Sequence, residues 1–151
     1  MEARMGHPAF VVPGAMKALQ ALSKSADDAG LPKELLELVH LRASQINGCS
    51  VCVGMHAGAL QNGGDSMEKV FTVAAWRDAP YFTDAERAAL ALTEAVTRLA
   101  DQAEPVSDEL WQEASKHFGE KELGALLISI SAINVWNRLN AATKQVAGAA
   151  W

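Results

Sequence analysis

The spacing of apolar residues restricts this chain to a helical fold. Alanine and leucine recur three and four residues apart over long stretches, and the alternation of apolar with polar residues that marks strands is missing. Glycine, proline and asparagine interrupt these stretches and indicate where helices end. The pattern therefore predicts an all-α protein with six to seven helices.

The interruptions divide the chain into expected helical segments. Their approximate ranges are 13–26, 32–46, 49–62, 65–76, 83–100, 105–118 and 121–145. Thr83 and Asp65, each followed three residues later by a glutamate, match the capping-box pattern with which many helices begin. Because Asn47 and Gly48 form a turn signal, the second and third segments are expected to make a central antiparallel hairpin.

No internal repeat, low-complexity tract or long linker divides the 151 residues. This length is close to that of one typical domain, and half of the residues are hydrophobic, which is enough to fill one core. We therefore expect residues 1–151 to form a single-domain helical bundle. The second and the last segments are apolar on several sides, which favours burial against a further subunit and so a homo-oligomer.

Charge and hydropathy exclude several classes of function. The net charge is −5, and no run of lysine and arginine offers a surface for nucleic acid or an anionic membrane. The longest nearly apolar stretch, residues 123–136, is too short for a membrane span, and the first residues show no apolar signal segment. We therefore expect a cytoplasmic protein whose cysteines are mostly reduced and form no structural disulfide.

The two cysteines, Cys49 and Cys52, form a Cys-x-x-Cys pair. This spacing puts both sulfurs on one helical face, which His56 continues one turn further along. Because Gly48 ends the preceding helix, the sulfurs should lie in a first helical turn, where free N–H groups and the helix dipole favour thiolate over thiol. We therefore predict a lowered pKa for at least one cysteine. The opposite face is apolar and expected to be core: Val51, Met55 and Leu60.

Glu37 is a carboxylate flanked by leucines, and a buried carboxylate needs a partner. At ~1.5 Å of rise per residue, Glu37 lies ~15 Å before the turn at Asn47 and Gly48, and His56 lies ~10 Å after Cys49. In an antiparallel hairpin these two residues come roughly level. The sequence therefore predicts that Glu37 holds the imidazole of His56 and raises its basicity, and that His56 exchanges a proton with a cysteine.

Simpler interpretations of the same residues stay open. The two cysteines and His56 would supply three zinc ligands, with a fourth from His40 or from far along the chain. Because no second Cys-x-x-Cys pair exists, we expect no metal, and we expect no cofactor because no glycine-rich phosphate loop is present. The cysteines could also be inert core residues. His40 lies one turn from Glu37 and competes for it.

Other polar residues have less defined roles. Three of them interrupt the apolar last segment: Asn134, Asn137 and Arg138. They could line the site, bridge subunits or form a polar strip, and the sequence leaves this choice open. His7 and His117 are expected at the surface.

The stretch from Glu37 to His56 resembles the core motif of the alkylhydroperoxidase D group, which belongs to the carboxymuconolactone decarboxylase superfamily. That motif is a glutamate, eleven intervening residues, and then Cys-x-x-Cys-x-x-x-His, and all four of its positions are present here. Segments 76–77, 82–90 and 133–138 also look like the family's later landmarks, so the resemblance covers about residues 10–145. The family's hydroperoxidases carry a second histidine just before the second cysteine, where this chain has Val51.

The resemblance implies a thiol-dependent peroxidase of the alkyl hydroperoxide reductase type, a peroxiredoxin-type oxidoreductase, with an all-helical subunit that forms trimers or hexamers. Cys52 would be the peroxidatic cysteine that becomes a sulfenic acid, and Cys49 would be the proton donor and resolving cysteine that closes a disulfide. Glu37 and His56 would form the proton relay. The implied partners are a small peroxide and a dithiol reductant, either a lipoyl-linked or a thioredoxin-like protein.

Two other functions stay open. Superfamily membership alone suggests a lyase of the carboxymuconolactone decarboxylase type, but that chemistry does not need paired cysteines. A non-catalytic oligomeric protein could instead use the dithiol as a redox switch, with reversible disulfide formation and no turnover.

Overall fold

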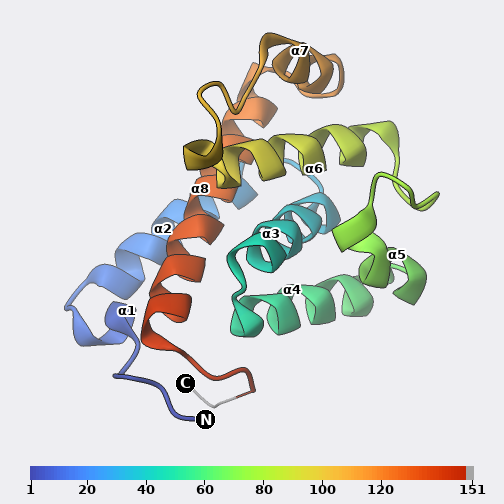
Figure 1. The fold of residues 1–151 in the computed structure, drawn as a ribbon. Helices are drawn as coiled ribbons and strands as arrows, with labels where there is room; N and C mark the ends of the chain where they lie inside the picture. The colour runs from blue at the N-terminus through green and yellow to red at the C-terminus, as the bar shows by residue number, and fades with distance from the viewer. Residues whose placement is uncertain (149–151) are drawn as a thin grey trace.

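The computed structural model describes residues 1–148, and this part of the chain is built from helices and the loops between them (Figure 1). The predicted all-α class is therefore confirmed. The α-helices are α1 (Pro8–Val11), α2 (Ala15–Asp27), α3 (Lys33–Asn47), α4 (Ser50–Gly63), α5 (Met67–Thr72), α6 (Asp84–Thr97), α7 (Asp108–His117) and α8 (Glu120–Thr143). Two short 3-10 helices, η1 (Val73–Ala75) and η2 (Leu99–Asp101), follow α5 and α6.

Two helix starts show how well capping signals predict boundaries. The capping box of Thr83 is present, because its side chain accepts from the backbone N–H of Glu86 and the Glu86 side chain accepts in return. The predicted cap at Asp65 is wrong by one residue. Ser66 caps α5, because its hydroxyl accepts from the backbone N–H of Lys69, whereas the carboxylate of Asp65 accepts from the side chain of Lys69 at 3.0 Å.

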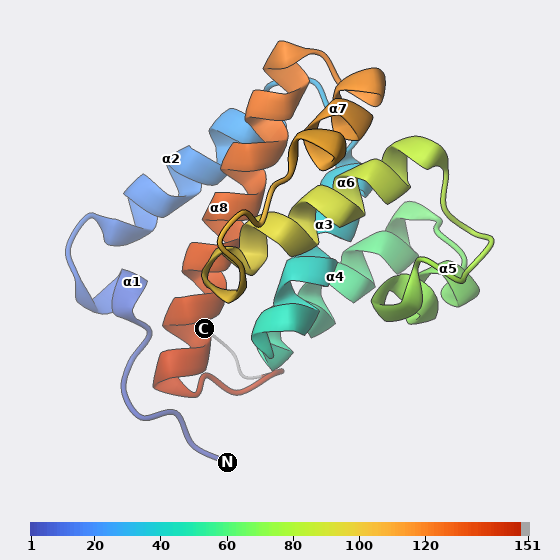
Figure 2. The same cartoon turned by 45° about the horizontal axis from the view of Figure 1, so that its top comes forward.

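The hairpin of α3 and α4 has the predicted antiparallel form. Gly48 ends α3 with φ 67° and ψ 29°, a left-handed conformation that glycine adopts without strain. The N–H of Cys49 then donates to the carbonyl of Ser44 at 3.0 Å, and α4 runs back along α3. Gly63 near the end of α4 accordingly lies beside Glu34 at the start of α3. Figure 2 shows the two helices side by side.

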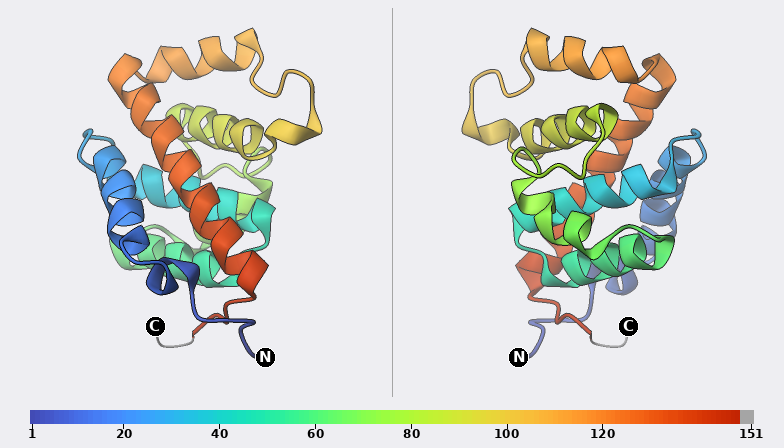
Figure 3. Two further views of the ribbon diagram at one scale, coloured as in Figure 1. Left: turned by 90° about the vertical axis from the view of Figure 1, so that its left-hand side faces the viewer. Right: turned by 90° about the vertical axis from the view of Figure 1, so that its right-hand side faces the viewer.

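Helix α3 is the centre of the subunit, because it packs against α4, α6 and α8. Its leucines face different neighbours: Leu36 packs with Leu126 of α8, and Leu38 packs with Leu60 of α4. Helix α8 crosses one face of the molecule and also packs against α2 (Figure 3). The apolar sides of α3 and of α8 are thus largely covered within one subunit, so by themselves they do not require a second copy.

The N-terminal segment is bound to the C-terminal end of α8. The backbone N–H of Arg4 donates to the carbonyl of Thr143 at 2.8 Å, and the side-chain amide of Gln145 donates to the carbonyl of Met5 at 3.1 Å. This attachment brings His7 inward, where it is 5% exposed and its ring lies 5.8 Å from that of Trp136. The expectation of a surface position for His7 is therefore wrong, because no pattern near position 7 indicates that its loop is held against α8.

Membrane-spanning helices need about 20 mostly apolar residues. Within residues 1–148, none of the helices combines this length with the apolar character that crossing a bilayer requires.

Candidate active site

The cysteine pair lies where the sequence predicts it, at the start of α4. Cys49 is the N-cap of this helix, and its sulfur accepts from the backbone N–H of Cys52 at 3.3 Å. Both residues are buried. Their Cα atoms are 5.4 Å apart, within the range that a disulfide spans, and the sulfurs are joined. The structure thus contains the oxidised pair, whereas the sequence led us to expect reduced thiols.

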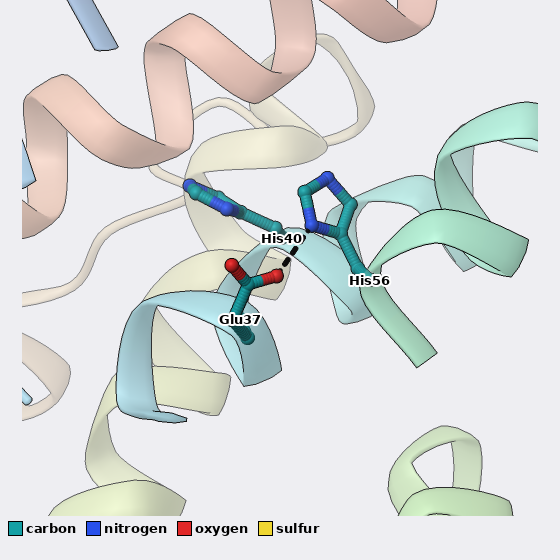
Figure 4. A group of neighbouring side chains, drawn as sticks. All are labelled: Glu37, His40 and His56. Carbon is teal, nitrogen blue, oxygen red and sulfur yellow. Dashed lines mark hydrogen bonds and ion pairs between the residues drawn. The ribbon is translucent and has the colours of Figure 1, made fainter. Parts of the chain in front are cut away.

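Glu37 and His56 meet across the hairpin, as the helical spacing predicts (Figure 4). Oε2 of Glu37 lies 2.7 Å from Nδ1 of His56, and the side chains are 17% and 9% exposed. Burial raises the pKa of Glu37, but the hydrogen bond and charge of His56, with smaller contributions from nearby basic groups, lower it by more. The net result is a Glu37 pKa below its ordinary value, so the carboxylate is charged at neutral pH.

His40 stands next to this pair without bonding to Glu37. Its Nε2 lies 2.7 Å from the hydroxyl of Ser129 in α8, and its ring lies 4.8 Å from that of His56. Burial, together with the charge of His56, lowers the pKa of His40 to about 3, although Glu37 acts in the opposite direction. His40 is therefore neutral under physiological conditions. The sequence suggested that it competes with His56 for Glu37, but its Nε2 is paired with Ser129 instead.

A pocket of about 600 Å³ opens beside these side chains. Of the two cysteines, both within the described part of the chain, Cys52 alone lines the pocket, together with Glu37, His40 and His56. The other walls are mainly apolar and include Phe10, Met16, Leu36, Ile133 and Trp136. The pocket therefore borders Cys52, which is itself 1% exposed, and both histidine rings, whereas Cys49 does not line it.

The predicted core face of α4 is only partly buried. Leu60 is buried, as expected, but Met55 is 60% exposed and Val51 is half-buried, and both line the pocket. These two side chains face the pocket because α4 is covered by α3 and α8 on its other sides. The expectation that Met55 belongs to the core is therefore wrong.

Asparagines of α8 hold the cysteine-bearing turn. The amide of Asn47, at the end of α3, donates to the Oδ1 atoms of Asn134 and Asn137 at 2.9 Å each. One turn further along, Nδ2 of Asn140 donates to the sulfur of Cys52 at 3.3 Å. The polar residues of this helix thus anchor the site, except for Arg138, which is exposed. The sequence analysis missed Asn140, although its spacing of three from Asn137 and six from Asn134 on an apolar helix is a signal that could have found it.

The zinc site that the sequence left open would use both cysteines as ligands, but in the structure their sulfurs are joined in a disulfide. A different group, Glu37, His40 and His56, brings one ligand atom from each side chain within 4.8 Å of the others. Nδ1 of His40 and Nε2 of His56 are buried and have no hydrogen-bond partner in the structure. Glu37 bonds Nδ1 of His56, so these two ring nitrogens stay unpartnered, and the group is a hydrogen-bonded pair with a neutral histidine beside it.

Taken together, the fold and the site define an all-helical dithiol protein in which a Cys-x-x-Cys pair begins one helix of a hairpin and a Glu–His pair joins its two helices. The chain belongs to the carboxymuconolactone decarboxylase family, whose family model matches residues 13–95.

Similar proteins extend this assignment over most of the chain. The uncharacterized protein YdfG of Bacillus subtilis (strain 168) is 30% identical over 132 residues, which cover 87% of this chain and 88% of YdfG. A solved structure from Agrobacterium tumefaciens, of a protein of unknown function proposed to be the antioxidant defence protein AhpD, is 32% identical with a TM-score of 0.91. The match covers 99% of this chain and 100% of that one.

The debrominase Bmp8, in its apo form, shares the fold at lower identity. It is 23% identical with a TM-score of 0.80, over 91% of this chain and 73% of the debrominase chain. At this level the likeness extends to the fold alone.

Proposed function

We propose that this protein is a thiol-dependent peroxidase of the alkyl hydroperoxide reductase type, with Cys52 as its peroxidatic cysteine. The observation that carries the proposal is the position of the Cys52 sulfur. It lines an apolar pocket together with the paired Glu37 and His56, and it is within bonding distance of Cys49. A nucleophile, an oriented base and a second thiol are the groups that such a reaction needs.

In the first step, the thiolate of Cys52 attacks one oxygen of the peroxide and the O–O bond breaks. Sulfur gives two electrons to the peroxide and becomes a sulfenic acid, and the leaving alkoxide takes a proton and departs as an alcohol. His56 is the proton carrier one helical turn from Cys52, and the carboxylate of Glu37 compensates the positive charge when the ring is protonated.

In the second step, the thiolate of Cys49 attacks the sulfur of the sulfenic acid, an S–S bond forms, and the hydroxyl leaves as water after protonation. An external dithiol then reduces the disulfide by thiol–disulfide exchange and is itself oxidised. The Cys49–Cys52 disulfide in the structure corresponds to the enzyme before this reduction. A lipoyl-linked or thioredoxin-like protein is the reductant that we propose, in the cytoplasm.

We further propose that the subunits assemble as trimers or hexamers. The support is a set of exposed apolar side chains at one end of the pocket and on α1, of which Phe10 and Met55 are each 60% exposed. Such residues are costly to leave in water and are often covered by another subunit. Light scattering should therefore give a mass near three or six times the 16.1 kDa of one chain, and a mass near 16.1 kDa would contradict the assembly.

The test of the activity is peroxide consumption by the reduced protein with dihydrolipoamide as the dithiol. We expect turnover with an organic hydroperoxide, no turnover in Cys52→Ser, and unchanged turnover in Ser50→Ala, which alters the exposed residue between the cysteines. Disulfide formation without turnover would contradict the proposal and favour the redox switch. Thiols that do not react with peroxide at all would contradict both and leave the lyase.

A further inference from the structure

The sulfur of Cys52 receives its hydrogen bond from another helix. At the start of α4 the backbone N–H of Cys52 donates to the sulfur of Cys49, so this N–H group of the helix terminus stabilises the sulfur of Cys49 rather than that of Cys52. The sulfur of Cys52 accepts instead from Nδ2 of Asn140, which is 6% exposed on α8. The two sulfurs therefore have different donors, a backbone amide for one and a side-chain amide for the other.

We propose that Asn140 is a catalytic residue of this protein, whose side-chain N–H stabilises the thiolate of Cys52, and that His7 is a positioning residue that orients Asn140. The inference deepens the proposed function, because it takes Cys52 as the reactive thiol. A carboxamide does not titrate, so it donates at every working pH. A hydrogen bond to an anion is stronger than one to a neutral group, so this donor favours the thiolate over the thiol.

His7 reaches Asn140 because the N-terminal segment is tied to the end of α8. Arg4 donates to the carbonyls of Thr143 and Ala142, at 2.8 Å from its backbone and 3.0 Å from its side chain. In the buried ring of His7, Nδ1 accepts from the backbone N–H of Ala9 at 3.1 Å. The neutral ring therefore carries its proton on Nε2.

Asn140 is the side chain that interacts with the ring of His7 and raises its pKa. The amide nitrogen of Asn140 donates to sulfur, and its oxygen is buried without a hydrogen-bond partner in the structure, so Oδ1 is the group that remains to accept from the ring N–H of His7. Burial lowers the pKa of His7 more than this partner raises it, so the ring is neutral at pH 7 and acts as a hydrogen-bond donor rather than as a charge. His7, Asn140 and Cys52 thus line the same pocket, and Asn140 is the one of them that bonds the sulfur.

The experiment measures the pH midpoint of the reaction of Cys52 with iodoacetamide in a Cys49→Ser background, in which Cys52 is the sole thiol. The other titratable groups that line the same pocket are unchanged in the Asn140 variants: His56 on α4, Glu37, His40 and Lys33 on α3, Asp27 on α2, and His7. We expect Asn140→Ala to raise the midpoint by about one pH unit, a tenfold loss of thiolate at neutral pH. Asn140→Asp keeps the shape, removes the donor and adds a negative charge, so it should raise the midpoint further.

The variants of His7 test positioning. His7→Ala should raise the midpoint of Cys52 by less than Asn140→Ala does, and His7→Gln, which can still donate to the amide, should restore most of it. The matched control is Ser131→Ala, which changes an exposed polar residue of the same helix and should leave the midpoint unchanged.

An unchanged midpoint in Asn140→Ala would overturn the inference, and an unchanged midpoint in His7→Ala would overturn the part on His7. The measurement uses no peroxide, so it is independent of the proposed activity. A shifted midpoint in a protein that does not consume peroxide would support the role of Asn140 while removing the peroxidase.

Discussion

Nδ1 of His56 lies 2.7 Å from Oε2 of Glu37, although 19 residues separate them in the chain. The contact exists because α3 and α4 run antiparallel from the turn at Gly48, which makes the two positions level. It also places a charged carboxylate, with its pKa below the ordinary value, against a histidine that lies one helical turn from Cys52.

Glu37→Gln should slow the oxidation of Cys52 by peroxide. Glutamine can still hydrogen-bond to the ring of His56, but it lacks the charge that compensates a proton on that ring. We expect the rate of disulfide formation after mixing with peroxide to fall by about 10²-fold, the low end of general acid–base contributions. Glu34→Gln, an exposed change in the same helix, is the control. Equal rates in both variants would remove Glu37 from the relay.

Gly48→Ala should destabilise the hairpin that carries the site. The added methyl group meets no atom within 4 Å, so the whole cost comes from the left-handed backbone at φ 67° and is about 1 kcal/mol. Gly54→Ala is the matched comparison, because Gly54 is exposed within α4 and its Cβ also meets open space. It should stabilise the protein by about 1 kcal/mol. Urea unfolding measures both, and a neutral Gly48→Ala would contradict the structure of the turn.

The neutral state of His40 predicts how stability responds to acid. Its pKa is near 6.5 in the unfolded chain and about 3 in the folded one, so between these values the unfolded state binds the extra proton. The contribution of His40 to stability is therefore present above pH 6.5 and decreases as the pH falls toward 3. The free energy of unfolding should thus depend less on pH between 6 and 4 in His40→Gln than in the parent. A titration of His40 near pH 6.5 in NMR spectra would contradict this.

Glu94 on α6 is a second buried carboxylate, and its hydrogen bonds connect α6 to α3 and to the residues after η1. Its oxygens accept from Arg42 at 2.7 Å, Trp76 at 3.0 Å and Arg77 at 2.7 Å. Burial raises the pKa of Glu94, and these partners together lower it by more. Its stabilising effect is therefore present above the unfolded carboxyl pKa and is lost as the pH falls through the lowered folded value.

Glu94→Ala leaves Arg42, a cation whose side chain is 11% exposed, without its carboxylate partner and should cost about 3 kcal/mol in urea unfolding at pH 7. The acid dependence of stability should also become shallower in this variant. Glu113→Ala, which breaks an exposed ion pair with Lys116, should change stability far less. Similar losses in the two variants would show that burial does not determine the effect.

The sequence was informative where local rules act. Helical periodicity predicted the fold class, and the glycine at position 48 predicted a turn whose geometry makes Glu37 and His56 level. The cap position of the cysteine pair followed from the same turn. These features depend on rise per residue and on the backbone freedom of glycine, which a single chain segment determines.

The parts that were missed depend on contacts between distant segments. His7 is buried because its loop is bound to α8 more than a hundred residues away, and no pattern near position 7 announces that. The spacing of Asn140 from Asn134 and Asn137 puts it on the same face of α8, but the sequence does not show that this face meets Cys52. Met55 is exposed because it faces a pocket, and an apolar residue on a helix gives no sign whether its face is covered.

The most direct test of the central assignment is to trap the first oxidation product. The Cys49→Ser variant is mixed with one equivalent of organic hydroperoxide in the presence of dimedone, which reacts with sulfenic acids, and the labelled residue is found by mass spectrometry. We predict one dimedone adduct on Cys52 in this variant, and no adduct on Cys49 in the Cys52→Ser variant under the same conditions. An adduct on Cys49 in the Cys52→Ser variant, or no adduct in either, would contradict the assignment of Cys52 as the thiol that attacks peroxide.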